Sequence, residues 1–277
     1  MAGVIVVFDF DKTIIDVDSD NWVVDNLGFT EQFERLLPTM PWNTLMDTMM
    51  GELHAHGKTL ADIAAVLKSA PLDPRVPAAI RAAYALGCDL RVLSDANAFF
   101  IDTILAHHGL RGLFTEVNTN PSHIDSSGRL RIGPCHDFDP SSGPAHGCEV
   151  GTCPPNMCKG LVLDRILREA QAARKRVVYL GDGRGDYCPA LRLRRGEDFV
   201  MPRRGFPVWD LIRDDPARVQ AEVHPWADAA EMEDTLLRIV RRVIVEEAVT
   251  LDCKLESTMP VAVQDGMPPI MPLRVNN

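Results

Sequence analysis

Two aspartates near the start of the chain have a spacing that suits covalent chemistry. They belong to an Asp-x-Asp-x-Thr motif at residues 9–13, directly after the apolar run Val4–Phe8. Asp9 is suited to attack phosphorus and form an aspartyl-phosphate, and Asp11 to protonate the leaving group and later activate water. Because two such carboxylates repel each other, they call for a cation, and Mg²⁺ prefers oxygen ligands. Taken alone, the motif also fits a solvated turn or a helix cap.

Two further side chains have the chemistry to bind a phosphoryl group. Ser94 follows the apolar run Asp89–Leu93, and its hydroxyl can donate to a phosphate oxygen or cap a helix that begins near Ala96. Lys159 precedes a helix with an apolar stripe, where its charge could screen the nucleophile and the phosphoryl group. A solvated surface lysine is the alternative interpretation of Lys159.

A glycine-rich segment supplies two more carboxylates. Residues 181–186 read Gly-Asp-Gly-Arg-Gly-Asp and follow a third apolar run, Arg176–Leu180. The glycines permit a tight loop that presents Asp182 and Asp186 on one side, as a site for a hard cation requires. A plain glycine–aspartate turn is the alternative.

The elements that must position these residues alternate between strand and helix. A fourth strand is predicted at Phe199–Met201, and the predicted helices cover 43–54, 59–67, 98–106, 161–170 and 232–247. Strands alternating with helices predict an α/β fold with a Rossmann-like parallel sheet. Ligands of such sheets bind at the carboxyl ends of the strands, where Asp9, Ser94 and Asp182 fall.

The chain between the first two strands is too long for a simple crossover. We therefore predict a catalytic core of residues 1–15 and 74–250 with an inserted helical cap at 16–73. Residues 115–157 are rich in Gly, Pro, Ser, His and Cys and predict a further insertion within the core, with a hairpin around 126–128. Residues 258–277 contain prolines without periodicity and are expected to be a disordered tail.

The four clusters, in this order, resemble the haloacid dehalogenase superfamily of phosphohydrolases. That resemblance implies that Asp9 is the nucleophile, that Asp11 is the general acid and base, and that Ser94 and Lys159 bind the phosphoryl group. It further implies a Mg²⁺ ion held by Asp9, the Asp11 backbone carbonyl and Asp182, with Asp186 supporting this metal site. It also implies the helical cap.

A longer set of motifs resembles the phosphoethanolamine/phosphocholine phosphatase family, whose plant relatives include enzymes assigned to inorganic pyrophosphate and thiamine monophosphate. The motifs are residues 9–16, 19–20, 93–97, 153–160, 181–183 and 186–189. In the family, the positions that match Asp20 and Asp95 contact the substrate beyond its phosphate. Two extra carboxylates would attract a cationic head group and repel a second phosphate. Asp20 could instead cap a helix, and Trp22 and Trp42 could face a quaternary ammonium or belong to the core.

The main hypothesis is therefore a magnesium-dependent hydrolase of small phosphomonoesters such as phosphoethanolamine or phosphocholine. A thiamine monophosphate phosphatase and an inorganic pyrophosphatase are the alternatives within catalysis. A protein that binds phosphorylated ligands without turning them over is the alternative outside catalysis.

The cysteines depart from the family pattern. Family members commonly show Cys-x-x-Cys-Pro before the lysine motif, whereas four residues separate Cys148 from Cys153 here. Because Cys135, His136, His146 and Cys158 are close in sequence, one interpretation is a structural Zn²⁺ site. Buried free thiols are the other interpretation, which the altered spacing favours.

Composition bounds the partners. The net charge of −10 argues against nucleic acid and anionic membrane as partners, since both are bound by dense Lys/Arg patches. The chain has no apolar stretch of about 18 residues that would span a bilayer, and its N-terminus reads as a buried strand rather than a signal peptide. We expect a cytoplasmic protein whose partner is a small phosphorylated substrate; the oligomeric state is not predicted.

Overall fold

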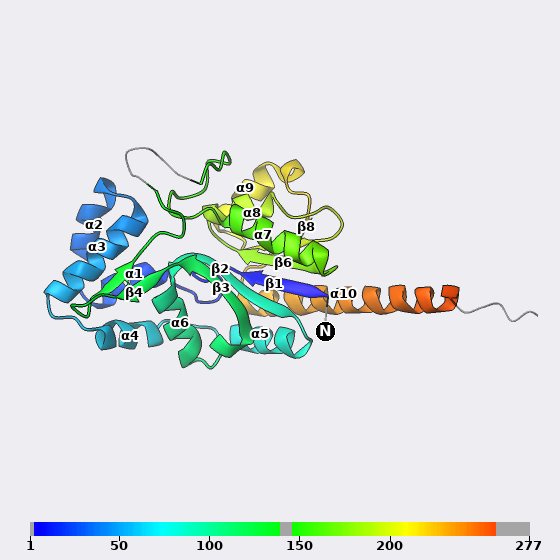
Figure 1. Cartoon of the computed structure of the whole chain (residues 1–277), viewed down its shortest axis with the longest axis horizontal. Coiled ribbons are helices and arrows are strands. Elements are labelled where there is room, and N and C mark those ends of the chain that lie inside the picture. Colours follow the sequence, from blue (N-terminus) through cyan, green and yellow to red (C-terminus); the bar gives the residue numbers. More distant parts are fainter. Residues whose placement is uncertain (1–2, 139–145, 259–277) are drawn as a thin grey trace, which may run out of the picture.

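A six-stranded parallel sheet forms the centre of the molecule (Figure 1), in the order β3-β2-β1-β6-β7-β8. The computed structural model describes residues 3–138 and 146–258. The sheet strands are β1 Val4–Phe8, β2 Asp89–Asn97, β3 Phe114–Asn120, β6 Arg176–Gly181, β7 Phe199–Pro202 and β8 Glu222–Val223. The predicted disordered tail lies, from residue 259 onward, outside the described residues.

Helices cover both faces of this sheet (Figure 1). They are α1 Ser19–Asn26, α2 Thr30–Leu36, α3 Trp42–Ala55, α4 Leu60–Lys68, α5 Arg75–Ala85, α6 Ala98–His107, α7 Lys159–Ala172, α8 Tyr187–Ala190, α9 Pro207–Asp214 and α10 Ala229–Thr258. Single 3₁₀ turns occur at Leu37–Thr39, Arg111–Leu113, Arg184–Asp186 and Pro216–Arg218. The predicted α/β fold with a parallel sheet is confirmed. Within the described residues, no helix combines the length and apolar character that a bilayer crossing requires.

Strand β1 is apolar throughout because both of its faces are buried. Val4, Val6 and Phe8 join the core cluster that includes α5, α6 and α10. Ile5 and Val7 point the other way, into the cluster with α7 and α9. Side chains alternate along a strand, so a strand between two helical layers reads as a continuous apolar run. Burial of this strand fixes the position of Asp9, the residue that directly follows it.

Strand β2 continues beyond the predicted end at Leu93. A register shift separates Leu93 from Asn97, which pairs with Asn120 of β3. The cap of α6 is Asn97, whose side chain accepts a hydrogen bond from the Phe100 backbone N–H at 3.1 Å. Ser94 therefore lies within the strand, and its alternative role as a helix cap is wrong.

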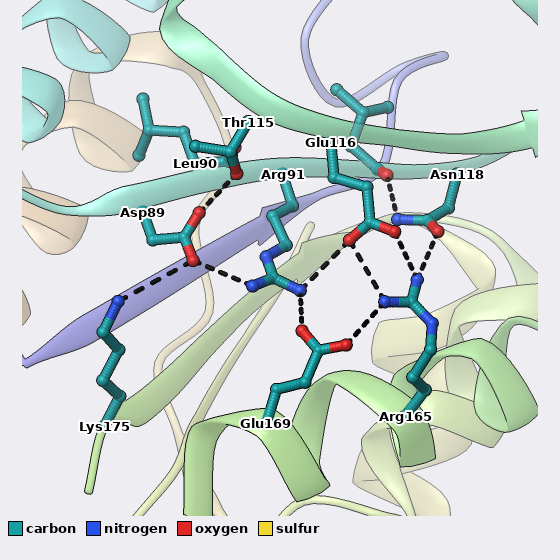
Figure 2. A network of polar contacts seen from close by, with 10 residues as sticks. Asp89, Leu90, Arg91, Thr115, Glu116, Asn118, Arg165, Glu169 and Lys175 are labelled. Atoms are coloured by element: carbon teal, nitrogen blue, oxygen red, sulfur yellow. Dashed lines mark hydrogen bonds and ion pairs between the residues drawn. The ribbon is translucent and has the colours of Figure 1, made fainter. Parts of the chain in front are cut away.

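A network of charged side chains anchors α7 to β2 and β3 (Figure 2). Arg91 of β2 donates to Glu116 of β3 at 3.1 Å and to Glu169 of α7 at 2.6 Å. Arg165 of α7 donates to Asn118 of β3 at 2.6 Å. Because Lys159 is the first residue of α7, these contacts help to set where its side chain reaches the sheet edge.

The predicted hairpin exists and contacts the predicted cap. Its strands are β4 Ser122–Ile124 and β5 Leu130–Ile132, which pair antiparallel. Asp47 of α3 accepts two hydrogen bonds from the Arg131 guanidinium at 2.8 Å and one from the Ile132 N–H at 2.9 Å. Residues 115–120, assigned from sequence to the insertion, instead belong to the core strand β3. The division into core and cap is retained as a proposal, with the hairpin assigned to the cap side.

The Asp47 carboxylate should stabilise this contact in a pH-dependent way. Burial alone would raise the pKa of Asp47, but hydrogen bonds from Arg131 and Ile132 outweigh it and hold the pKa below its usual 3.8. The stabilisation is therefore present above pH 3.8 and is lost as the pH falls through the lowered pKa. Since the pair is partly exposed, we expect Asp47→Asn to cost about 1–2 kcal/mol at pH 7.

Urea denaturation of the wild type and Asp47→Asn at pH 7 and in acid measures this contribution. The control is Asp102→Asn, which removes a carboxylate from the exposed pair with Arg111. A stability gap between wild type and Asp47→Asn that is unchanged in acid would contradict the assignment.

Candidate active site

The carboxyl ends of β1, β2 and β6 open into one pocket of about 380 Å³. Asp9 and Asp11 follow β1, Asp95 lies near the end of β2, and Asp182 follows β6; all four line the pocket. Lys159 reaches the same pocket from the start of α7. The strand-end clusters predicted from sequence therefore do meet at one edge of the sheet.

Lys159 is buried, with 3% of its side chain exposed, so the surface-lysine alternative is wrong. Its Nζ lies 2.9 Å from Asp9 Oδ1, 2.9 Å from Asp186 Oδ1 and 3.7 Å from Asp95 Oδ1. Burial alone would lower the pKa of Lys159, but Asp186 and Asp9 outweigh it and raise the pKa well above its usual value. The site thus contains a permanent positive charge beside Asp9.

Asp186 supports the site from behind and is fully hydrogen-bonded by the protein. Its Oδ1 accepts from the Tyr179 hydroxyl at 2.6 Å as well as from Lys159. Its Oδ2 accepts from the backbone N–H groups of Asp182 at 3.0 Å and Gly183 at 2.8 Å. Gly181 allows this approach, because a Cβ there would lie 2.4 Å from the Asp186 Cγ. These contacts fit the supporting role expected of Asp186 better than direct metal ligation.

Asp9 and Asp182 have the features of a pair that binds a divalent cation. Carboxylate oxygens of Asp9, Asp182 and Asp186 lie within 4.8 Å of one another, and all three residues are buried. Burial, followed by the charge of Asp186, raises the pKa of Asp9 well above its usual value and that of Asp182 to about 7. One lysine does not neutralise three carboxylates, so the oxygen-only donor set fits Mg²⁺.

Asp11 lies at the pocket wall in an environment that suits an acid. Its Oδ2 accepts from the Ser19 hydroxyl at 3.1 Å, while its buried Oδ1 has no hydrogen-bond partner among the described residues. Burial, followed by the charges of Asp18 and Asp20, raises the pKa of Asp11 well above its usual value. A carboxyl with a raised pKa keeps its proton to higher pH and can deliver it to a leaving group.

The loop that carries Asp11 depends on a residue that the sequence analysis missed. Lys12 has a φ of 54°, in the left-handed region that is uncommon for residues other than glycine. Arg203, just beyond β7, donates to the Lys12 carbonyl and, at 3.1 Å, to Asp16. The same guanidinium lies over the rings of Phe206 and Trp226, 4.6 and 5.0 Å from their centroids. An arginine after a strand end is a weak signal in sequence, and only the contact reveals its role.

Two predicted site residues lie behind the pocket wall rather than in it. Ser94 is fully buried, and its hydroxyl accepts from the Ala96 N–H at 3.3 Å. Asp20 is buried in α1 and accepts from the Trp42 indole N–H at 2.7 Å. The helix is capped by Asp18, whose side chain accepts from the Asn21 N–H, so Asp20 is not the cap. Asp18, which the sequence analysis did not select, lines the pocket instead.

The cysteine-rich segment supplies both pocket wall and a thiol cluster. Residues 151–154 line the pocket beside Asp9 and Lys159. Cys148, Cys153 and Cys158 gather with Cys188 of α8 rather than with the histidines expected from sequence. His136 and His146 instead contact each other edge to face, with ring centroids 5.8 Å apart.

Known structures and known sequences place this fold and site in one class. The structure of a substrate-bound phosphoserine phosphatase complex matches this fold with a TM-score of 0.53, over 82% of this chain and 95% of that chain. The two sequences are 12% identical, so the match shows a common fold and nothing more. Fold and site together define a phosphatase of the haloacid dehalogenase type. More narrowly, the chain belongs to the family described as Putative Phosphatase, whose model matches residues 4–240.

The relatives of this chain differ in the substrate that their names give. The chain is 55% identical to inorganic pyrophosphatase 1 of Arabidopsis thaliana, covering 86% of this chain and 80% of the relative. It is 47% identical to a thiamine phosphate phosphatase-like protein of the same plant, covering 89% and 99%. It is 32% identical to the human phosphoethanolamine/phosphocholine phosphatase, covering 84% and 88%.

Asp186→Asn should test the supporting role of this carboxylate. One amide group cannot accept from Lys159, Tyr179 and two backbone N–H groups at once, so buried donors lose their partner. We expect a loss of about 3 kcal/mol or more in unfolding free energy, measured by urea denaturation without added metal. Asp210→Asn is the matched control, because Asp210 pairs with Arg213 on the surface. Equal stability of the two variants would contradict the role.

Proposed function

We propose that this phosphatase hydrolyses inorganic pyrophosphate, with Mg²⁺, through an aspartyl-phosphate on Asp9. The observation that carries the proposal is the presence of two further cations in the pocket wall, Lys12 and Arg184, besides Lys159. A substrate with two phosphates needs positive charge beyond the reacting phosphorus, and charge-assisted hydrogen bonds from Lys and Arg provide it. The 55% identity to a relative named as an inorganic pyrophosphatase supports the same choice.

The first step is attack by Asp9 on the phosphorus. Its Oδ1 accepts from Lys159 Nζ and from the Phe10 N–H at 2.7 Å, which leaves Oδ2 for the attack. A bond forms between Oδ2 and phosphorus while the bond from phosphorus to the leaving oxygen breaks. Lys159 stabilises negative charge on the transferred group, and Asp11 gives its proton to the leaving oxygen.

The second step is hydrolysis of the aspartyl-phosphate. Asp11, now ionised, accepts a proton from a water molecule, whose oxygen attacks the phosphorus and releases Asp9. Asp9, Asp182 and the Asp11 carbonyl are the groups that would hold Mg²⁺, with Asp186 behind them. When bound, the ion supplies charge neutralisation and orientation for the transferred phosphoryl group.

The position of Asp20 weakens the argument for a cationic head group. That argument required two carboxylates, Asp20 and Asp95, beside the phosphate. Asp20 is hydrogen-bonded to Trp42 and does not line the pocket, and burial, followed by Asp18, raises its pKa to about 8. A carboxyl that is largely protonated at neutral pH attracts a cation weakly. The main hypothesis from sequence is therefore less well supported than its pyrophosphate alternative.

A small cationic phosphomonoester is the second candidate. Asp95, with 46% of its side chain exposed, and Asp18 both line the pocket and offer negative charge to an ammonium group. Relatives named for phosphoethanolamine/phosphocholine and for thiamine phosphate share the family. Both candidates use the same chemistry at Asp9, so substrate choice is tested separately from mechanism.

Replacing the nucleophile tests the mechanism for every candidate substrate. We expect Asp9→Asn to lower magnesium-dependent phosphate release by at least about 10³-fold, because the covalent route is lost. A rapid-quench experiment should trap phosphate on wild-type Asp9 and none on the variant. Asp102→Asn, on the exposed side of α6, is the control and should retain full turnover. Substantial turnover by Asp9→Asn would show that the nucleophile is another group.

Charge changes in the pocket wall test the choice of substrate. Arg184→Gln should lower kcat/KM for pyrophosphate about tenfold more than for phosphocholine, the effect of one lost charge-assisted contact. Asp95→Asn should do the reverse and favour pyrophosphate. Asp20→Asn, behind the wall, should affect both substrates alike. If Arg184→Gln changes both substrates equally, the pyrophosphate proposal fails while the mechanism at Asp9 stands.

A further inference from the structure

The four thiols of Cys148, Cys153, Cys158 and Cys188 meet at one point beside the pocket. Their sulfurs all lie within 4.8 Å of one another. Four of the sulfur pairs are 148–153 at 3.6 Å, 153–158 at 3.5 Å, 148–188 at 3.6 Å and 158–188 at 3.8 Å. We propose that these cysteines bind one Zn²⁺ ion as a closed, structural site.

The spacing of the sulfurs agrees with tetrahedral zinc. With a Zn–S distance of about 2.3 Å, the edges of a tetrahedron of four sulfurs are about 3.8 Å long. The observed separations of 3.5–3.8 Å are close to that edge. Bonded sulfurs would lie about 2.05 Å apart and in pairs, whereas here each of the four sulfurs contacts at least two others. These mutual contacts favour one shared centre over two separate disulfide bridges.

The surroundings supply what a thiolate site needs. Cys158 is the cap residue of α7, so the positive end of a helix points toward the cluster. The Arg192 side chain also interacts with Cys188. Four thiolates with one Zn²⁺ carry a net charge of about −2, and these positive groups offset it.

The fold also makes room for the cluster. Gly160 has a negative φ, so its backbone conformation does not demand glycine. A Cβ at this position would lie 2.4 Å from the Cys188 sulfur. The absence of a side chain at Gly160 is thus explained by the close approach of α7 to the thiols.

The site joins two parts of the active-site wall that are distant in sequence. Cys153 lies in the wall segment 151–154, and Cys158 directly precedes Lys159. Cys188 lies two residues after Asp186, which hydrogen-bonds Lys159. A metal ion bound by all four would hold the Lys159 side of the pocket against the Asp186 side. Since four protein ligands leave no open position, the role is structural and not catalytic.

Metal content of the purified full-length protein is the direct test. Elemental analysis should find about one zinc per chain, bound in the presence of excess magnesium. Cys148→Ser and Cys188→Ser should each lose most of this zinc, whereas Cys88→Ser, at a buried cysteine outside the cluster, should retain it. Cobalt substituted for zinc should give the absorption bands of tetrahedral thiolate ligation.

A thiol assay provides a second readout that does not depend on folding of the variants. When the native wild type is titrated with a mercurial reagent that attacks thiols, zinc should be released in proportion to the modification of the four cluster thiols. The proposal would be overturned if zinc-free protein with four reduced thiols melted at the same temperature as protein supplied with zinc. Disulfides among these four cysteines, detected by mass spectrometry of unreduced peptides, would overturn it as well. Neither result depends on the substrate, so the proposed function is tested independently.

Discussion

The rest of the site depends on the contact of the Lys159 ammonium group with Asp9 and Asp186. It lies 2.9 Å from both Asp9 and Asp186, in a place where only 3% of its side chain is exposed. Parallel strands bring their carboxyl ends to one edge, and three aspartates there would repel one another without a cation. Removing one member of such a buried set leaves an uncompensated charge. The lysine offsets part of the repulsion among these carboxylates, and a bound divalent cation would offset the rest.

Contacts from several elements position the Lys159 side chain. Arg91 and Arg165 anchor α7 to the strands β2 and β3 (Figure 2), and α7 begins with Lys159. Asp186 fixes the ammonium group from the far side while also accepting from Tyr179. The proposed zinc site would add a third constraint at the residue directly before Lys159. Precise placement of charge at the reacting group is what electrostatic catalysis requires.

The substrate that we propose rests on the balance of charges in the same wall. Lys12 and Arg184 favour a second phosphate, while Asp18 and Asp95 favour a cationic group. Because Lys12 pairs with Asp18 at 3.5 Å, part of each charge is already neutralised within the protein. Arg184 is exposed and lies in the loop between Asp182 and Asp186, where it can approach a substrate that the metal site holds. Members of one family can thus differ in substrate through a few wall residues around constant chemistry.

The sequence by itself determined the sheet and the chemistry, because both are written in local patterns. Val4–Phe8 is apolar on both faces, and the motifs around Asp9 and Asp182 directly follow strands, so their place at the sheet edge could be read in advance. The tertiary structure decided what depends on packing between distant segments. It turned Asp20 toward Trp42, placed Ser94 inside β2 and brought Arg203 to the Lys12 carbonyl. It also added Cys188 to three cysteines that lie 30 to 40 residues earlier. Burial and side-chain direction follow from those long-range contacts, and no local pattern encodes them.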